Sequence, residues 1–228
     1  MEPRYLERPA AEIGDADPKV AMPYGMTAAG VVAAVNDLYA YLQALNRASI
    51  EHGYERLEDI MLPAGFSGLL SELFVRAVAK ELATVLPGVT KNLRPGGRPD
   101  LIPRAKYPGD AVHAGDDGVE VKVSTHETSW QGHNPETGWV MVVQASVDRK
   151  TAPVYGRSPT TIERVLIAKL DKSDWSYSGR SATSRRTPTA SINKQGRDKL
   201  QRGIVYQRGR SKGQKPPPVP MPSEEPIA

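Results

Sequence analysis

The sequence contains no cysteine among its 228 residues. This absence excludes a disulfide scaffold, a zinc site with thiolate ligands and a thiol nucleophile, and it fits a reducing cytoplasm. Aromatic residues are scarce, at 6%, and no apolar run approaches the length of a membrane span. The amino-terminal residues lack the apolar stretch of a secretory signal. We therefore expect a cytoplasmic protein with no membrane partner.

Several catalytic motifs are also absent. The chain has no GxxxxGK[ST] loop, no GxSxG elbow and no GxGxxG turn, which excludes the common nucleotide-binding and serine-hydrolase motifs. His126, His133 and Asn134 are residue types found in ββα-metal nucleases and zinc sites. No Asp-His pair precedes a hairpin here, and no cysteine is available, so we do not assign that chemistry.

The chain divides by composition into segments of different character. Its apolar content of 39% permits one sizeable core, whereas the Pro-rich ends favour irregular structure. We expect four parts: an irregular arm over 1–26, a helical extension over 27–64, a catalytic core over 65–210 that includes a basic segment at 180–212, and a Pro-rich disordered tail over 213–228.

Apolar spacing and turn residues predict the main elements. Thr27 is a suitable N-cap for a helix to about residue 51, with Gly53 after its end. This helix is either core or a dimer element. Further predictions are a helix over 67–86, a hairpin or meander over 99–124, strands over 139–147, 163–170 and 204–206, and a basic helix over 189–202.

The segment 119–124 alternates valine with polar residues. In an extended strand alternate side chains point to opposite faces, so Val119 and Val121 share a core face while Glu120 and Lys122 share the other. A second acid, Asp100, follows a proline twenty residues upstream of Glu120. Such alternation is also ordinary on the solvated face of an antiparallel sheet.

Two acids and a lysine at neighbouring strands suit metal-dependent phosphodiester hydrolysis. Magnesium prefers oxygen ligands and keeps several waters, so Asp100, Glu120 and the carbonyl of Val121 would hold one or two ions. The metal neutralises charge on the phosphate, and Lys122 would orient the attacking water or stabilise the transition state.

The combination of Pro99-Asp100 with Glu120-Val121-Lys122 resembles the PD-(D/E)xK nuclease superfamily. The resemblance spans roughly residues 65–170, while its motif is five residues long. It implies an α/β (α+β) fold with a restriction-endonuclease-like core, in which a central mixed β-sheet is flanked by helices in an α–β–β–β–α–β order, preceded here by the N-terminal helical extension. It also implies that Asp100 and Glu120 bind metal and that Lys122 is catalytic.

Two further positions are implied by the same resemblance. Many members of the superfamily add a glutamate from the helix before the first acid, for which Glu72 is the candidate and Glu81 the alternative. Some members use a glutamine after the lysine strand, a role that Gln144 could fill. Gln144 could equally be a buried, hydrogen-bonded strand residue.

The charge distribution points to a polyanion partner. Residues 180–212 contain ten Lys or Arg and one Asp, a net charge of +9, so the remainder of a chain whose total is +4 carries −5. Double-stranded DNA is the expected partner, and a solvated basic tail is the other interpretation. The side-chain types that read base edges or hold phosphates occur at Gln131, His133, Asn134, Arg180, Arg185, Arg186, Asn193 and Lys194.

These features together predict a Mg²⁺-dependent endonuclease most similar to a type II restriction endonuclease, leaving 5′-phosphate and 3′-hydroxyl ends. Cutting both strands of a palindrome takes two active sites, hence a homodimer. The alternatives are a structure-specific repair or phage recombination nuclease of the same fold and a non-catalytic DNA-binding protein that uses the 189–202 helix.

Overall fold

The computed structural model describes residues 3–85, 88–125, 130–132, 134–177 and 189–209. Its α-helices are α1 (Ala28–Glu51), α2 (Leu57–Ile60), α3 (Pro63–Glu81) and α4 (Lys194–Arg202). Its strands are β1 (Val89–Lys91), β2 (Leu101–Pro103), β3 (Val119–Ser124), β4 (Gln131–Gly132), β5 (Gly138–Ser146), β6 (Thr161–Leu170), β7 (Trp175–Tyr177), β8 (Ala190–Ile192) and β9 (Ile204–Gln207). Short 3-10 helices lie at Arg4–Leu6, Ile13–Asp15, Pro108–Asp110, Val154–Gly156 and Lys172–Asp174.

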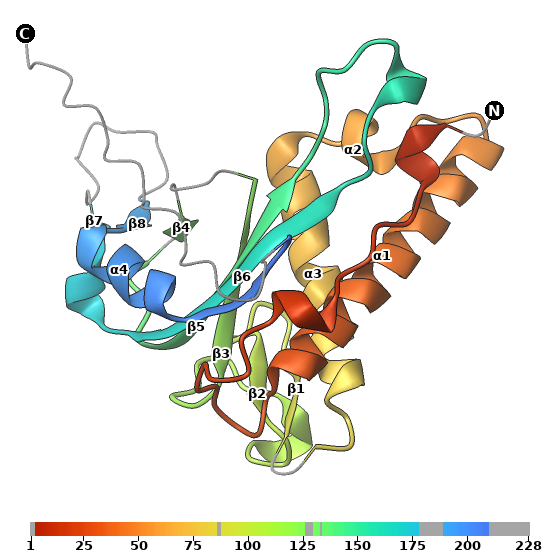
Figure 1. Cartoon of the computed structure of the whole chain (residues 1–228). Helices are drawn as coiled ribbons and strands as arrows, with labels where there is room; N and C mark the ends of the chain where they lie inside the picture. The colour runs from red at the N-terminus through yellow and green to blue at the C-terminus, as the bar shows by residue number, and fades with distance from the viewer. Residues whose placement is uncertain (1–2, 86–87, 126–129, 133, 178–188, 210–228) are drawn as a thin grey trace, which may run out of the picture.

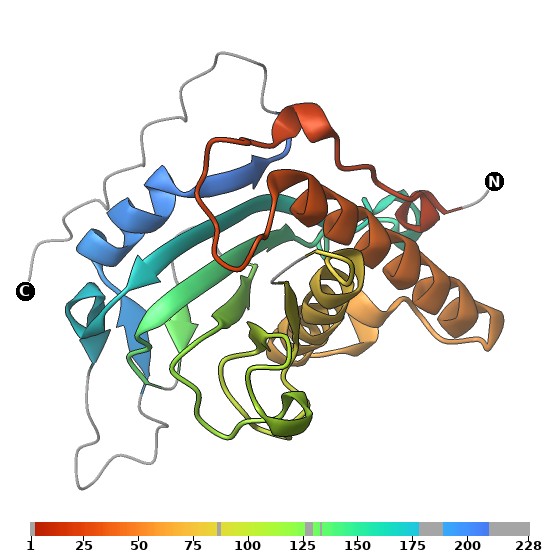
Figure 2. The same ribbon diagram turned by 90° about the horizontal axis from the view of Figure 1, so that it is seen from below.

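Six strands form one mixed sheet in the order β1-β2-β3-β5-β6-β9. β1, β2 and β3 are successively antiparallel, β3 and β5 are parallel, and β5, β6 and β9 are again antiparallel. A second, three-stranded sheet has the order β4-β8-β7. Helices α1 and α3 lie on one face of the large sheet, and α4 lies with the small sheet on the other side (Figures 1 and 2). The expected α+β class, with N-terminal helices packed on a mixed sheet, is confirmed.

Two apolar cores fill the spaces on either side of the large sheet. Met141 and Val143 of β5 pack with α1 and α3, whereas Val140 and Val142 face the small sheet and α4. All four of these side chains are fully buried. Burial on both faces explains why β5 reads as a nearly continuous apolar run rather than an alternating one.

Helix α1 matches its prediction closely. The side chain of Thr27 accepts a hydrogen bond from Gly30 N at 3.1 Å, which satisfies one of the free amides of the first turn. The helix ends at Glu51, and Gly53 follows with a φ of 81°, a conformation that glycine adopts without strain. Nine residues of α1 are buried, so the helix contributes to the core.

Helix α3 differs from its prediction at both ends. It begins at Pro63, four residues before the expected start, because proline at the first helical position loses no hydrogen bond. It ends at Glu81, so the predicted end at residue 86 was too late.

The predicted basic helix over 189–202 was also wrong at its start. Residues Ala190–Ile192 form β8, which pairs with both β4 and β7. Only Lys194–Arg202 is helical, and its N-cap is Asn193, whose side chain accepts from Gly196 N at 3.1 Å. A three-residue strand depends on its partners on either side, so its own sequence gives little indication of it.

Within its described residues, 3–26, the amino-terminal arm has two short 3-10 helices and no α-helix or strand, and it is packed against the domain. Asn36 of α1 exchanges two hydrogen bonds of 2.9 Å with the backbone of Ala11. Gln43 donates to the carbonyl of Leu6 at 2.6 Å. The arm therefore lies along α1 (Figure 2). The predicted tail over 213–228 lies outside the described residues.

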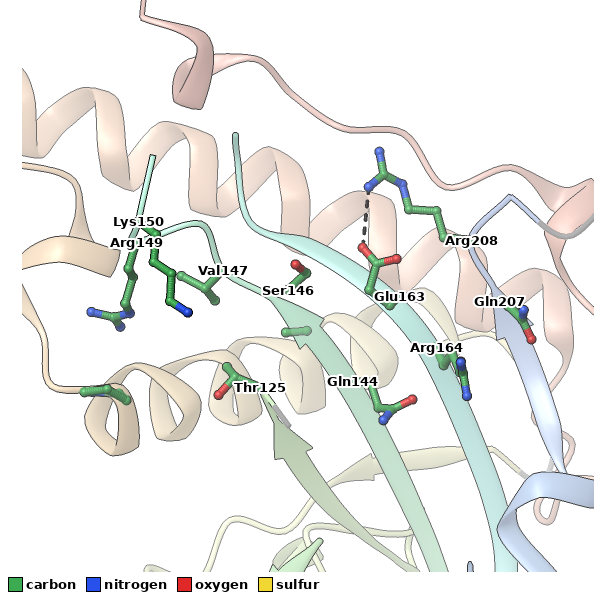
Figure 3. Close-up of a pocket in the computed structure, with 12 residues that line it drawn as sticks. Thr125, Gln144, Ser146, Val147, Arg149, Lys150, Glu163, Arg164, Gln207 and Arg208 are labelled. Carbon is green, nitrogen blue, oxygen red and sulfur yellow. Dashed lines mark hydrogen bonds and ion pairs between the residues drawn. The ribbon is translucent and has the colours of Figure 1, made fainter. Parts of the chain in front are cut away.

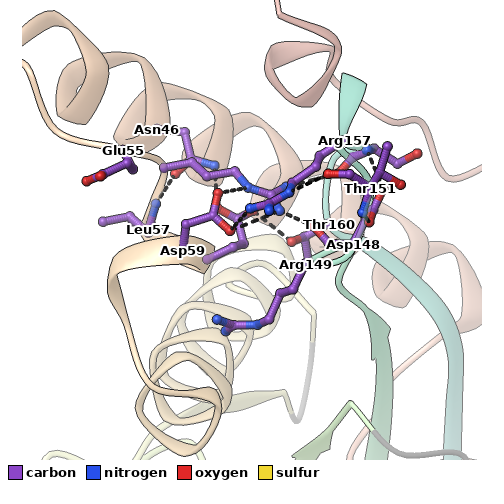
Figure 4. Close-up of polar contacts among 12 residues, drawn as sticks. Asn46, Glu55, Leu57, Asp59, Asp148, Arg149, Thr151, Arg157 and Thr160 are labelled. Atoms are coloured by element: carbon purple, nitrogen blue, oxygen red, sulfur yellow. Dashed lines mark hydrogen bonds and ion pairs between the residues drawn. The ribbon is translucent and has the colours of Figure 1, made fainter. Parts of the chain in front are cut away.

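A buried arginine attaches the connection between β5 and β6 to the helices. Arg56 is 1% exposed, and its guanidinium pairs with Asp59 at 2.7 Å. The same group donates to the carbonyls of Ser158 (3.0 Å) and Asp148. Asp59 and Asp148 lie close together in this network of polar contacts (Figure 4). A buried cation needs such partners for every donor, so the loop that supplies them is held in place.

A second buried polar group lies beside this arginine. Glu58 accepts hydrogen bonds from Asn46 at 2.8 Å and from Thr160 at 2.7 Å, and all three side chains are buried. Arg149, the next residue of the loop after Asp148, donates to the carbonyl of Met61 at 3.1 Å. The loop between β5 and β6 is thus fixed to α1, α2 and the start of α3.

No helix in the described part of the chain is both long enough and apolar enough to cross a membrane.

Replacing Arg56 by methionine should lower the free energy of unfolding by about 3–5 kcal/mol, because Asp59 and two carbonyls lose a buried donor. The matched control is Lys80→Met, which removes the ion pair of Lys80 with Asp37. The Lys80 side chain is 64% exposed, so its loss should cost less than about 1 kcal/mol. Urea unfolding measures both changes. Equal effects would contradict a stabilising role for the buried network.

Candidate active site

Strand β3 presents two different faces. Val119 and Val121 are buried in the core with α1 and α3, and Glu120 and Lys122 point to the other side. The Lys122 ammonium lies 2.5 Å from Glu120 Oε1, and the two side chains are 20% and 14% exposed. The predicted alternation is confirmed, and it places a partly desolvated carboxylate–ammonium pair on one sheet face.

Asp100 lies beside this pair at the junction of β2 and β3. These antiparallel strands are aligned through Leu101 and Val119, so Asp100 is opposite Glu120 and shares its face. One residue further on, the amide of Val121 donates to Asp100 Oδ2 at 2.8 Å instead of to a backbone carbonyl. The strand partner at this point is therefore a carboxylate.

This hydrogen bond also orients the carbonyl of Val121. In a strand, the N–H and the C=O of one residue point to the same edge. Since the N–H of Val121 points to Asp100, its carbonyl oxygen lies on the same edge. Two carboxylates and one carbonyl then supply oxygen atoms around the end of β2, the donor type that Mg²⁺ prefers.

The loop before Asp100 is held by Asn92. This buried side chain donates to the carbonyls of Pro99 (3.1 Å) and Val112 (2.9 Å) and accepts from the amides of Arg94 and Val112, both at 3.1 Å. The amide of Asn92 also donates to the carbonyl of Asp100 at 2.8 Å. Asn92 therefore fixes the backbone on which the first acid stands.

Close approach of β2 and β3 requires glycine at position 118. A Cβ on Gly118 would lie 2.3 Å from the carbonyl oxygen of Leu101, and the residue has a φ of 145°. The amide of Gly118 donates to the hydroxyl of Tyr24 at 2.9 Å. The arm thus contributes to the placement of the strand that carries Glu120.

The environment of Asp100 raises its pKa from 3.8 to about 6. Burial is the largest cause, because it disfavours the charged form, and the negative charge of Glu120 is the second. The hydrogen bond from Val121 and the charge of Lys122 act in the opposite direction without cancelling these effects. Two close carboxylates with incomplete compensation favour a bound cation.

The fourth acid is not part of a preformed cluster. Among the described residues, no group of three or more His, Cys, Asp or Glu is arranged to hold a metal ion. Glu72 of α3 forms an ion pair with Lys91 of β1, and its side chain is 63% exposed. Its charge makes a smaller contribution to the raised pKa of Asp100. Glu81, the alternative, lies 3.7 Å from Lys80 at the end of α3.

The small sheet lies against the lysine. A Cβ placed on Gly132 of β4 would be 3.6 Å from Lys122 Cε and 3.8 Å from its Nζ. Gln131 and Asn134, two predicted DNA contacts, flank this position and are exposed. His133 lies outside the described residues. Sequence alone gave no reason to place this loop beside Lys122.

The predicted DNA contacts in the basic segment differ in their surroundings. Asn193 is occupied in the cap of α4, where its Nδ2 also donates to the carbonyl of Ser173 at 2.7 Å. Lys194 is exposed and pairs with Asp198 at 2.9 Å. Arg180, Arg185 and Arg186 lie outside the described residues.

The described strands do fix where that arginine-containing segment begins and ends. It joins β7 to β8, in which Tyr177 pairs with Ala190, and Ala190 pairs with Gly132. The two residues that bound this segment, Tyr177 and Ala190, are therefore in register with Gly132, the residue next to Lys122.

Comparison of the chain with protein-family models, with curated proteins and with solved structures gives no significant match.

Replacing Asp100 by asparagine should stabilise the metal-free protein at pH 8. The pKa of Asp100 is higher in the folded than in the unfolded state, so its contribution to stability falls as the pH rises from 3.8 through about 6. Above that range the charged carboxylate disfavours folding by up to about 3 kcal/mol. Asparagine is neutral and can still accept from Val121.

Thermal unfolding in EDTA at pH 5 and pH 8 measures this effect. The gain for Asp100→Asn should be larger at pH 8. The control is Asp117→Asn, an exposed acid whose pKa is lowered by its hydrogen bond with Lys106, and it should give no gain. An Asp100→Asn gain that is absent at pH 8 would show that the site does not disfavour the carboxylate.

Proposed function

We propose that this chain is a Mg²⁺-dependent endonuclease that hydrolyses DNA phosphodiester bonds, most similar in kind to a type II restriction endonuclease. The observation that carries the proposal is the grouping of Asp100, Glu120 and Lys122 on one face of two adjacent strands, with a raised pKa at Asp100. The products would carry 5′-phosphate and 3′-hydroxyl ends.

The order of elements around this group supports the resemblance to PD-(D/E)xK nucleases. Helix α3 precedes three antiparallel strands, β1 to β3, and β5 then pairs with β3 in parallel. This is the α–β–β–β then β arrangement that the resemblance implies. One difference is that the described residues between β3 and β5 include the strand β4, where the superfamily order has a helix.

The donor set fits magnesium. Asp100, Glu120 and the carbonyl of Val121 would hold the ion, which supplies charge neutralisation at the phosphate and an acidified water. With Glu120 holding the ion, Lys122 would lose its present partner. The ammonium can then donate to a phosphate oxygen or orient the attacking water. Asn92 and Gly118 keep the two acids in register while this happens.

DNA as the substrate is supported by charge. Most of the link between β7 and β8 belongs to the +9 segment over 180–212, and the strand residues at the two ends of this link, Tyr177 and Ala190, are in register with Gly132. The cations of this segment would hold the phosphates that flank the scissile one. A palindromic site cut in both strands would require two copies of the chain.

Cleavage of plasmid DNA in the presence of Mg²⁺ tests the proposal. Asp100→Ala, Glu120→Gln and Lys122→Met should each reduce the cleavage rate by at least about 100-fold while DNA binding persists, because they remove charge stabilisation rather than substrate contacts. EDTA should abolish cleavage by the parent protein.

Lys106→Met is a suitable control for the lysine. Lys106 pairs with Asp117 in the segment between β2 and β3, and both side chains are exposed, so its loss should leave the rate within about twofold. Discrete fragments from the parent indicate site-specific restriction. Smearing or cutting of branched DNA indicates a repair nuclease, and binding without cutting indicates a DNA-binding protein. Undiminished cleavage by Lys122→Met would falsify the active-site assignment.

The two helix glutamates can be separated in the same assay. Glu72→Gln should slow cleavage by about tenfold or more if Glu72 completes the metal environment, whereas Glu81→Gln should leave the rate unchanged. Lys91→Met serves as the control for loss of the Glu72 ion pair itself. Equal rates for Glu72→Gln and Lys91→Met would assign Glu72 a structural role.

A further inference from the structure

A cavity of about 700 Å³ lies at the end of the large sheet, where β5 ends and β6 begins. Its wall includes four basic side chains, Arg149, Lys150, Arg164 and Arg208, against one acid, Glu163. Figure 3 shows these groups around the ends of β5, β6 and β9. The cavity therefore suits an anion.

The cations of this cavity are not equally available. Arg149 donates to the carbonyl of Met61, and Arg208 pairs with Glu163 at 3.5 Å. For the guanidinium of Arg164 the described residues provide no ion pair or side-chain hydrogen bond. Arg164 is also partly buried, which makes an unpaired charge there costly unless a ligand supplies its partner.

Strand register connects Arg164 with the catalytic face. Ser124 pairs with Gln144, Gln144 with Arg164, and Arg164 with Gln207. Residues paired across a sheet share a face, so this polar row lies on the same side as Lys122, which is two residues before Ser124. Figure 3 shows Gln144, Arg164 and Gln207 side by side on three strands.

The spacing of the row separates Arg164 from the hydrolytic group. Two strand spacings of about 4.8 Å and two residues of about 3.4 Å place the backbone of Arg164 roughly 12 Å from that of Lys122. The Lys122 ammonium is held at Glu120, on the side away from Ser124. Because Lys122 extends towards Glu120 and Arg164 lies beyond Ser124, Arg164 is placed to contact a phosphate other than the scissile one.

We propose that Arg164, flanked by Gln144 and Gln207, binds a backbone phosphate of the DNA strand being cut, outside the scissile phosphodiester. This inference rests on the proposed function and specifies its substrate contact. A guanidinium binds phosphate through two parallel donors, and the neighbouring amide of Gln207 can donate to the same group. Such a contact positions the strand without reading its sequence.

The test measures binding of fluorescein-labelled duplex DNA in EDTA across a range of salt concentrations. Arg164→Met should weaken binding about tenfold, and the slope of log affinity against log salt should become shallower by about one. Arg164→Lys should restore most of the slope, which a folding defect would not allow. The matched control is Arg76→Met, since Arg76 is exposed on α3 about 20 Å along the helix from Pro63.

Cleavage kinetics give an independent measurement. Arg164→Met should raise KM about tenfold and leave kcat within about threefold, because the contact is made equally in the ground and transition states. If the parent binds and cuts DNA while Arg164→Met keeps the parental affinity and salt slope, the inference alone is overturned. If the parent neither binds nor cuts DNA, the proposed function fails and this inference with it.

Inorganic phosphate distinguishes a small-anion site from a strand contact. Phosphate binding, measured by calorimetry, should be weak in both the parent and Arg164→Met. The inference would be overturned if the parent bound phosphate tightly, Arg164→Met lost that binding, and the salt dependence of DNA binding stayed unchanged. The cavity would then be a site for a free small anion.

Discussion

The hydrogen bond from the amide of Val121 to the carboxylate of Asp100 links the sheet to the candidate active site. At this point a side chain takes the place of a strand neighbour, which brings an acid into the plane of the sheet and turns the carbonyl of Val121 towards it. Asn92 and Gly118 both serve this contact, one by fixing the loop before Asp100 and the other by letting β2 approach β3. Without that contact, Glu120 and Lys122 would be an ordinary ion pair on a strand.

The buried position of Asp100 has an energetic cost, which the hydrogen bond from Val121 offsets only in part. Burying a carboxylate beside another carboxylate raises the pKa of Asp100 and opposes folding at neutral pH. The two apolar cores on either side of β5 offset this cost. Strain of this electrostatic kind is concentrated at functional sites, because a binding partner of opposite charge relieves it.

Sequence patterns predicted the parts of the molecule that depend on local periodicity. The alternation in β3 and the capped helix α1 are of this kind. The small sheet was missed because strands of two or three residues are stabilised by distant partners rather than by their own pattern. Asn92 gives no sequence signal for its loop contacts. Arg164 could have been found, since period-two spacing in β6 puts it on the face of the buried Leu166 and Ala168. The sequence does not choose between Glu72 and Glu81 as the fourth acid, because the choice depends on how α3 packs against the sheet.

The irregularity between β5 and β6 determines which side chains reach the cavity. Gln144 pairs with Arg164 and Ala145 pairs with Ile162, so Glu163 has no residue opposite it in β5. This extra residue resets the alternation, and Ile162 and Val165 both enter the same core although three positions separate them. Glu163 and Arg164, which are adjacent in the sequence, can therefore both lie at the end of the sheet while Ile162 and Val165 stay in the core. The charge at this end of the sheet therefore depends on the number of residues in β6 as well as on which side chains it carries. Inserting or deleting one residue before Arg164 would move several side chains to the opposite face of the sheet at once.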